Sequence, residues 1–232
     1  MLFYFLNVFK NDEMVGSKAQ RTRELIRGVA LRSFRDVGFD ATTMRSVAEG
    51  AGVSLGNAYY YFPTKNHLVQ ELYIEVQEAH RDAVEPLLAD TTDLVERLRI
   101  VYQEGLAQLA PFHQYAAGFL SAMIAPNSPL NPLSEESLPA RQITIGLFRE
   151  AITGAKNPPP AEFHDRMPNA LWLSYLLLSL YWSYDHSNNQ QRTHRLLTQG
   201  LRLLKVAMPA IRTPLLRAPV RSMLDLVTEA GL

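Results

Sequence analysis

Residues 44–61, MRSVAEGAGVSLGNAYYY, predict two short helices joined by a tight turn. Gly52 can adopt the positive φ that such a turn requires. Val47, Ala48 and Ala58 are small or apolar at positions that would face the joint between the helices. This is the pattern of a helix-turn-helix, whose second helix enters the major groove of DNA. The second helix here would be about 12 Å long, which is about the width of that groove.

Three consecutive tyrosines, Tyr59, Tyr60 and Tyr61, end the second helix. Neighbouring side chains on a helix point about 100° apart, so these three cover about 200° and cannot all face one core. We expect Ala58, Phe62 and the inner part of one tyrosine to close the core, and Tyr59 and Tyr60 to point outward. In the alternative interpretation, the tyrosines are core filler and surface decoration of an ordinary helical bundle.

An apolar stripe before this pair predicts an amphipathic helix that Gly38 ends. Its members recur at steps of one, three and four residues: Leu25, Ile26, Val29, Ala30, Phe34 and Val37. Thr42 or Thr43 offers an N-cap to the first short helix, and Ser54 offers one to the second. Thr64 would cap a longer helix that follows. The segment therefore predicts a head of three helices with the start of a fourth.

The rest of the chain is also helical in pattern. Beyond Asp93 we predict helices near 93–109, 112–125, 134–154, 160–186 and 190–208, with a further one at 213–229. We find no strand pair and no internal repeat. The predicted fold is all-α, with a helix-turn-helix domain at residues 15–75 and a larger helical domain at 76–232.

Residues 1–14 are interpreted as an extension, either disordered or preceding a true start at Met14. The opening run MLFYFLNVF is apolar but lacks the basic segment and the cleavage site of a secretion signal. The most apolar run of the chain, ALWLSYLLLSLYWSY at 170–184, is shorter than the about 20 residues that a spanning helix needs. We therefore expect a buried core helix there, no membrane partner and a cytoplasmic protein.

Charge is distributed unevenly along a chain with no net charge. Residues 15–67 hold eight basic and four acidic residues, so this segment carries +4 and the remainder −4. Such a split fits a nucleic-acid-binding head, although a chance imbalance of solvated faces accounts for it equally well. The 232 residues include no cysteine, which excludes disulfides and thiolate metal sites, and 47% are apolar, which is enough for a sizeable core.

The stretch TTMRSVAEGAGVSLGNAYYYFPTKNHLVQEL at 42–72 resembles the DNA-binding head of the TetR family of bacterial regulators. The matching elements are G-F-D-A-T-T-M at 38–44, then A-x-x-A-G-V-S, then the ending Y-x-Y-F-P-T-K. The resemblance covers about residues 20–75, and the remainder agrees only in length and helical architecture. It implies a homodimer that binds a double-stranded DNA operator and, in the family's usual mode, represses until a small effector releases it.

The expected DNA contacts follow from the pattern and from the resemblance. They are Thr43, Arg45, Ser54, Leu55, Gly56, Asn57, Tyr59, Tyr60 and Lys65, with Lys18, Arg21 and Arg23 on flanking phosphates. Tyr59 and Tyr60 would place their rings against sugar and thymine methyl groups and their hydroxyls near phosphate, and Lys65 would reach phosphate as a point charge. Leu55 and Asn66 depart from the family pattern. Leu55 stands where many relatives carry a polar or basic reader, so it offers only apolar contact.

Aromatic residues are frequent between 93 and 210. In a family member some of them would line a cavity for an apolar small molecule of unknown identity. The expected pocket residues are Phe119, Met123, Phe148, Trp172 and Tyr175, although plain core packing is the alternative for each. His113, Gln114, Arg141 and Gln142 are polar candidates for the same pocket or ordinary core and surface residues.

The last long helices, 160–186 and 190–208, resemble the pair that forms the family's dimer. Their apolar content exceeds what one face needs, which suits a buried interface between two copies. Seven basic residues and no acidic one lie between Ser187 and Leu224. A second anionic contact would explain that run, but we favour a solvated face.

Enzyme and metal functions are not indicated. The six histidines form no H-x-x-x-H or H-E-x-x-H pair, and there is no phosphate-binding glycine loop. We therefore expect no catalytic residues, no metal and no cofactor. The main hypothesis is a ligand-responsive DNA-binding regulator. The alternative is a DNA-associated protein of the same fold whose C-terminal domain binds a protein partner.

Overall fold

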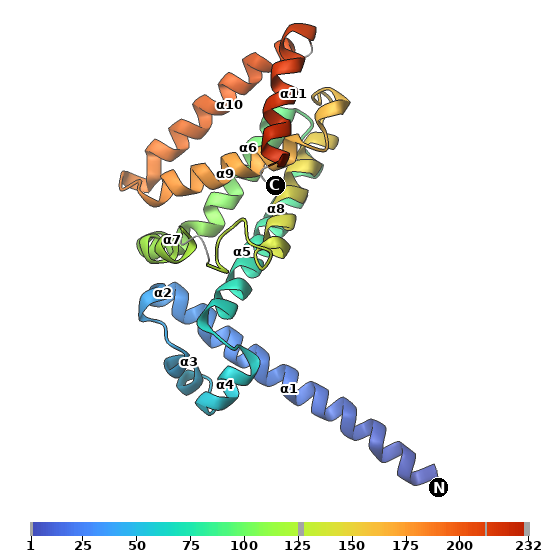
Figure 1. Cartoon of the computed structure of the whole chain (residues 1–232), viewed down its shortest axis with the longest axis vertical. Helices are drawn as coiled ribbons and strands as arrows, with labels where there is room; N and C mark the ends of the chain where they lie inside the picture. The colour runs from blue at the N-terminus through green and yellow to red at the C-terminus, as the bar shows by residue number, and fades with distance from the viewer. Residues whose placement is uncertain (1, 125–127, 212, 230–232) are drawn as a thin grey trace. The chain divides into compact units, whose positions relative to one another are not determined.

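A computed structural model describes residues 2–124, 128–211 and 213–229. Every regular element in these ranges is a helix, so the predicted all-α class is confirmed (Figure 1). The chain divides into two compact units, Met1–Leu72 and Tyr73–Leu232. None of the described helices is long and apolar enough to cross a membrane.

The first unit is built on one long helix. It holds α1 (Leu2–Asp36), α2 (Gly38–Ala41), α3 (Met44–Gly50), α4 (Leu55–Tyr61) and the first residues of α5 (Lys65–Ala89). Helix α1 packs against α2 and α3, and α3 packs against α4. Helix α1 continues back to Leu2, whereas the sequence predicts an extension separate from the first helix. Residues 2–15 contain no proline or glycine that would interrupt it.

The predicted apolar stripe of α1 is correct for four of its six residues. Ile26, Val29, Ala30 and Phe34 are buried, but Leu25 is 50% exposed and Val37 is 49% exposed. Leu25 lies about 140° around the helix from Ala30, outside the arc that the four buried residues cover. Val37 follows the last helical residue, and Gly38 then turns the chain with a φ of +80°.

The second unit is a bundle of helices. It holds the rest of α5, then α6 (Leu94–Leu109), η1 (Ala110–Tyr115), α7 (Ala116–Ile124), α8 (Leu138–Thr153), η2 (Ala161–Phe163), α9 (Met167–Ser183), η3 (Asn188–Gln190), α10 (Gln191–Ile211) and α11 (Pro214–Glu229). Helix α8 packs against α6 and α9, and α10 packs against α6, α9 and α11. The chain reverses between α9 and α10, so these two helices form an antiparallel pair (Figure 1).

Prolines account for two differences from the predicted helices. The predicted helix 112–125 is a 3-10 turn followed by α7, because Pro111 stands at the start of the turn; residue 125 lies outside the described residues. The predicted helix 160–186 begins only at Met167. Pro160 precedes a separate short turn, and Pro168 occupies the first turn of α9, where a missing N–H costs nothing.

Candidate functional site

Local hydrogen bonds fix the first half of the helix-turn-helix. Thr43 caps α3, because its Oγ1 accepts the backbone N–H of Ser46 at 3.0 Å, and the Thr43 N–H is bound in return by the Ser46 Oγ at 3.1 Å. Gly52 then turns the chain with a φ of +64°, and the Val53 N–H donates to the Ala48 carbonyl at 3.0 Å. The predicted cap at Thr43 and the glycine turn are therefore confirmed.

The hydroxyls of the two capping residues, Thr43 and Ser54, differ in whether they are still available to donate a hydrogen bond. The Thr43 hydroxyl donates to the Ser46 Oγ at 3.1 Å, so a phosphate would have to displace this bond. The Ser54 Oγ accepts the Asn57 N–H at 3.1 Å and leaves its own proton available. Ser54 and Gly56 are exposed, whereas Leu55 and Asn57 are half-buried at the start of α4.

The three tyrosines divide as predicted. Tyr60 is 80% exposed and Tyr59 46% exposed, whereas Ala58 and Phe62 are buried. Tyr61 is half-buried, and its ring meets that of Tyr60 edge-on with centroids 5.1 Å apart. The outward direction of Tyr59 and Tyr60 is confirmed, and their contact with DNA stays a prediction.

Arg45 is the freest cation of the predicted interface. It is exposed on α3 and makes no hydrogen bond or ion pair with any other described residue. Lys65, in contrast, donates from Nζ to the Phe39 carbonyl at 2.8 Å and lies 3.8 Å from the centre of the Phe39 ring. Burial lowers the pKa of Lys65, and the nearby Asp40 opposes this shift. Lys65 thus joins α5 to α2 as well as carrying charge.

Arg23 is engaged in an ion pair within the first unit. Its guanidinium pairs with the Glu71 carboxylate, which also binds Arg27 Nε at 3.0 Å, and it lies 5.0 Å from the centre of the Phe62 ring. Contact between Arg23 and a flanking phosphate stays a prediction, and a phosphate would have to compete with the Glu71 carboxylate for this guanidinium. Arg23 and Glu71 are 48 residues apart in the chain, so no local sequence pattern indicates this pair.

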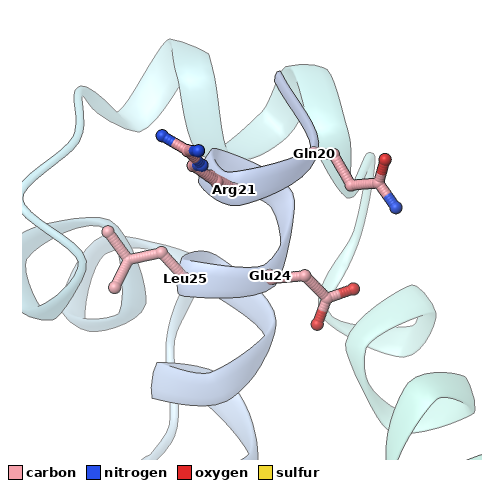
Figure 2. Close-up of a pocket in the computed structure, with 4 residues that line it drawn as sticks. All are labelled: Gln20, Arg21, Glu24 and Leu25. Atoms are coloured by element: carbon pink, nitrogen blue, oxygen red, sulfur yellow. The ribbon is translucent and has the colours of Figure 1, made fainter. Parts of the chain in front are cut away.

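Lys18 and Arg21 remain exposed cations on α1. Figure 2 shows a shallow pocket on this helix, with Arg21 and Leu25 on one side of the backbone and Gln20 and Glu24 on the other. Because Arg21 and Glu24 carry opposite charges, the lining of the pocket is neither purely positive nor purely negative. Arg21 is the cation that this part of α1 presents.

The structure brings three of the five predicted pocket residues together. Phe148, Trp172 and Tyr175 belong to one buried core cluster of the second unit, and the rings of Phe148 and Tyr175 lie 6.5 Å apart. Phe119 is outside that cluster and meets Phe112 edge-on at 6.2 Å, and Met123 is half-buried on the same helix, α7. Ligand contact stays a prediction for all five.

Two of the four polar candidates of the second unit, His113 and Arg141, have protein partners. Nε2 of His113 is 3.1 Å from the Trp182 carbonyl. Arg141 donates to the Pro132 carbonyl at 2.9 Å and lies 5.6 Å from the centre of the Trp172 ring. Sequence reasoning missed His80, which is fully buried on α5, because a lone histidine carries no pattern.

Helices α9 and α10 present an apolar surface. A groove of about 350 Å³ runs along the pair, with Tyr102 and Ser174 as its hydroxyl-bearing residues and leucines along its walls. Several large apolar side chains of the pair are also exposed: Leu177, Leu180, Tyr181, Tyr184, Leu196, Leu203 and Val206. A contiguous apolar surface along two adjacent helices is typical of a protein interface.

Two known families match separate parts of the chain. Residues 26–72 match the family described as bacterial regulatory proteins, tetR family, and residues 97–229 match the tetracyclin repressor-like C-terminal domain. Among curated proteins, the HTH-type transcriptional repressor KstR2 of Mycobacterium tuberculosis is 30% identical over 106 residues, 44% of this chain and 50% of its own. The HTH-type transcriptional regulator AcrR of Shigella flexneri is 38% identical over 63 residues, 27% of this chain and 29% of its own. The chain thus matches at most about half the length of these relatives.

Solved structures share the fold. A TetR transcriptional regulator from Nitrosomonas europaea has a TM-score of 0.57 at 18% identity, covering 78% of this chain and 96% of its own. The TetR-family repressor FadR of Thermus thermophilus, solved with lauroyl-CoA, has a TM-score of 0.59 at 23% identity, covering 77% and 94%. At these identities the likeness concerns the fold alone.

Proposed function

The chain belongs to the tetR family of bacterial regulatory proteins, and from that premise we propose that it is a homodimeric transcriptional repressor that a small apolar effector releases from its operator. The observation that carries the proposal is the capped helix-turn-helix, which exposes Tyr59, Tyr60 and Arg45 on its surface. The proposal gives the chain no catalytic role. Binding to chromosomal DNA would take place in the bacterial cytoplasm.

DNA binding would use two copies of the first unit. The dimer would place two α4 helices in successive major grooves of a near-palindromic site, about 34–36 Å apart. Arg45 and Lys65 would contact phosphates, while Ser54, Leu55, Gly56 and Asn57 would lie near base edges. The exposed apolar surface of α9 and α10 supports dimerisation through these two helices.

Release would use the second unit. The aromatic group of Phe148, Trp172 and Tyr175 supports an apolar effector, and α5 carries residues of both units along one helix. Shifting a regulator from 1:99 to 99:1 between two states needs about 5.5 kcal/mol of differential ligand affinity, which a tight apolar site can supply. KstR2 and FadR are named repressors, which supports repression as the sign of control.

A second candidate function keeps DNA binding and replaces the effector with a protein partner. Helix α11 exposes Met223 at 60% and Leu226 at 65%, while Arg217 and Arg221 on the same helix pair with Glu162. The two arginines of α11 thus have an ion-pair partner within the unit, whereas its apolar residues Met223 and Leu226 remain exposed. An effector that releases DNA would favour the first candidate, and a protein that binds through α11 would favour the second.

The decisive experiment measures binding of the purified chain to its own upstream DNA by fluorescence anisotropy over a salt series. Nanomolar affinity that falls steeply with salt and survives competition by random DNA is the expected result. Weak binding that does not distinguish the upstream DNA from random DNA would contradict the proposal.

A further inference from the structure

Two buried hydroxyl groups on α9 lack hydrogen bonds. The Oη of Tyr175 and the Oγ of Ser179 are sealed from solvent and have no hydrogen-bond partner in the described part of the chain. They lie one helical turn apart, so both project from the same side of α9. Burial raises the pKa of Tyr175, and the Ser179 hydroxyl comes near enough to oppose part of that rise, but the two hydroxyls do not reach the geometry of a hydrogen bond. Buried hydroxyls are normally paired, so this pair needs an explanation.

His80 adds a third polar group beside Tyr175. The two rings have centroids 5.9 Å apart. Nε2 of His80 is 2.8 Å from the Val101 carbonyl, which can only accept, so Nε2 carries the proton and Nδ1 is an acceptor. Nδ1 has only a long contact of 3.4 Å with the Gln77 amide, whose Oε1 already accepts from Thr144 Oγ1 at 2.6 Å. Nδ1 therefore keeps most of its capacity to accept a hydrogen bond.

Tyr175 and His80 converge on one glycine of α6. A Cβ at Gly105 would lie 2.7 Å from Tyr175 Oη and 2.8 Å from His80 Cε1. The Tyr175 hydroxyl of α9 and the edge of the His80 ring of α5 thus meet at bare backbone, where a larger residue would occupy their space. Around them lie apolar rings, since Phe148 is 6.5 Å and Tyr102 is 6.3 Å from Tyr175 between ring centroids.

We propose that Tyr175 Oη and Ser179 Oγ, with Nδ1 of His80 as a further acceptor, anchor the effector, and that the effector is an uncharged apolar molecule carrying a hydroxyl or carbonyl group. This inference rests on the proposed function, because it specifies the ligand of the same regulator. A hydroxyl or carbonyl would supply the partners that the two α9 hydroxyls lack. Opening the site for it would break no hydrogen bond of either group.

The charges around the site select an uncharged head group. Burial lowers the pKa of His80 to about 4, so its ring is neutral at pH 7 and cannot balance a carboxylate. Arg141 lies over Trp172 and is hydrogen-bonded to the Pro132 carbonyl. Within the described part of the chain, a buried carboxylate at Tyr175 would have to draw Arg141 away from these partners, and a buried carboxylate without a paired cation is strongly unfavourable.

The first arm of the test uses the full chain without ligand. Tyr175→Phe removes a hydroxyl that has no partner, whereas the control Tyr102→Phe removes one that lies 3.2 Å from the Leu171 carbonyl and 2.5 Å from Ser174 Oγ. Thermal unfolding should show an unchanged or raised Tm for Tyr175→Phe and a lowered Tm for Tyr102→Phe. An equal loss in both variants would mean that the Tyr175 hydroxyl is already bonded, which overturns the proposal.

The second arm uses matched probes on two apolar scaffolds. These are naphthalene, naphthol, methyl naphthyl ketone and naphthoate, and decanol, methyl octyl ketone and decanoate. We expect an alcohol or ketone to raise the Tm of the wild-type chain and to bind Tyr175→Phe about tenfold more weakly, since one hydrogen bond is lost. Tightest binding by a carboxylate, equal binding to both proteins, or no binding by any probe would overturn the proposal.

Binding to the upstream DNA, measured on the same samples without probe, distinguishes a failure of the proposed function from a failure of the proposed effector anchor. If the wild-type chain does not bind the upstream DNA specifically, the proposed regulator function is rejected. Intact DNA binding combined with any of the contrary probe results would reject only the anchor at Tyr175 and Ser179.

Discussion

The guanidinium of Arg97 fills the space in which a side chain at Gly154 would begin. A Cβ at Gly154 would overlap the guanidinium, so only glycine fits beside this arginine. Arg97 is 4% exposed, and it donates to the carbonyls of Ala151 and Glu150 at 2.9 Å each, at the end of α8. It also donates to the Leu88 carbonyl near the end of α5. One buried cation therefore caps two helices whose last carbonyls have no partner within their own helices.

Replacing Arg97 with methionine should therefore destabilise the second unit. The methionine keeps the apolar volume but removes the Arg97 donors to the Ala151 and Thr91 carbonyls, while the Glu150 and Leu88 carbonyls keep only their backbone donors. We expect a loss of about 3 kcal/mol in the free energy of unfolding. Arg99→Met is the matched control, because Arg99 forms an exposed pair with Glu96 at 3.0 Å and such pairs contribute about 1 kcal/mol or less. Urea denaturation of both variants checks this, and equal losses would contradict it.

The turn between α9 and α10 should make stability depend on pH through Asp185. Its Oδ2 accepts hydrogen bonds from the Thr193 N–H and from the Thr193 hydroxyl at 2.8 Å each, and its Oδ1 accepts one from the Ser187 N–H. Burial pushes the pKa of Asp185 up, but these hydrogen bonds outweigh it and hold the pKa well below its ordinary value. A carboxyl with a depressed folded-state pKa stabilises the fold above its unfolded pKa of about 4, and this stabilisation is lost as the pH falls toward the folded pKa.

Asp185→Asn tests this dependence. We expect the variant to be less stable than the wild-type chain by about 2 kcal/mol at pH 7, because hydrogen bonds to a charged group are lost. The difference should shrink as the pH falls below about 4. Denaturation of both proteins at pH 7 and in steps below pH 4 measures it, and a constant difference at every pH would rule out the charged carboxylate as the cause.

The exposed Tyr60 should matter for DNA and not for folding. Because its side chain is 80% exposed, Tyr60→Ala should leave the Tm nearly unchanged while lowering affinity for the upstream DNA about tenfold or more. Tyr60→Phe separates the hydroxyl from the ring, since a phosphate contact depends on the hydroxyl alone. Anisotropy at one salt concentration compares the three proteins. Unchanged affinity in Tyr60→Ala would remove Tyr60 from the interface.

The helix-turn-helix was predictable because its determinants are local. Thr43 and Ser54 cap helices within three residues of themselves, and Gly52 provides the turn by its own φ. The environments of Arg23 and Lys65 were not predictable, because they depend on partners 48 and 26 residues away in the chain. The same reason hid the unpaired hydroxyls of α9, since a missing partner is a property of the packed core.

Lys65 has a structural contact that the sequence did not indicate, and a substitution can separate it from a phosphate contact. Lys65→Met keeps the alkyl chain over Phe39 but removes the donor to the Phe39 carbonyl, so we expect a stability loss of about 1 kcal/mol. If Lys65 also contacts phosphate, the slope of log affinity against log salt should fall by about 1. Arg45→Met should lower the slope similarly with no loss of stability, because Arg45 has no partner among the described residues. A stable Lys65→Met protein would contradict the structural role of this lysine.

The apolar surface of α9 and α10 should hold the dimer together. Leu203 is 70% exposed on α10, and placing a charge there with Leu203→Glu should cost little in a monomer but a great deal in a buried interface. We expect light scattering to report a monomer for this variant. Its DNA affinity should also fall, because one head alone contacts only half of the site. Met223→Glu on α11 is the control, since Met223 is 60% exposed on another helix and should remain dimeric. A dimeric Leu203→Glu protein would place the interface elsewhere, and a monomeric Met223→Glu protein would extend the interface to α11.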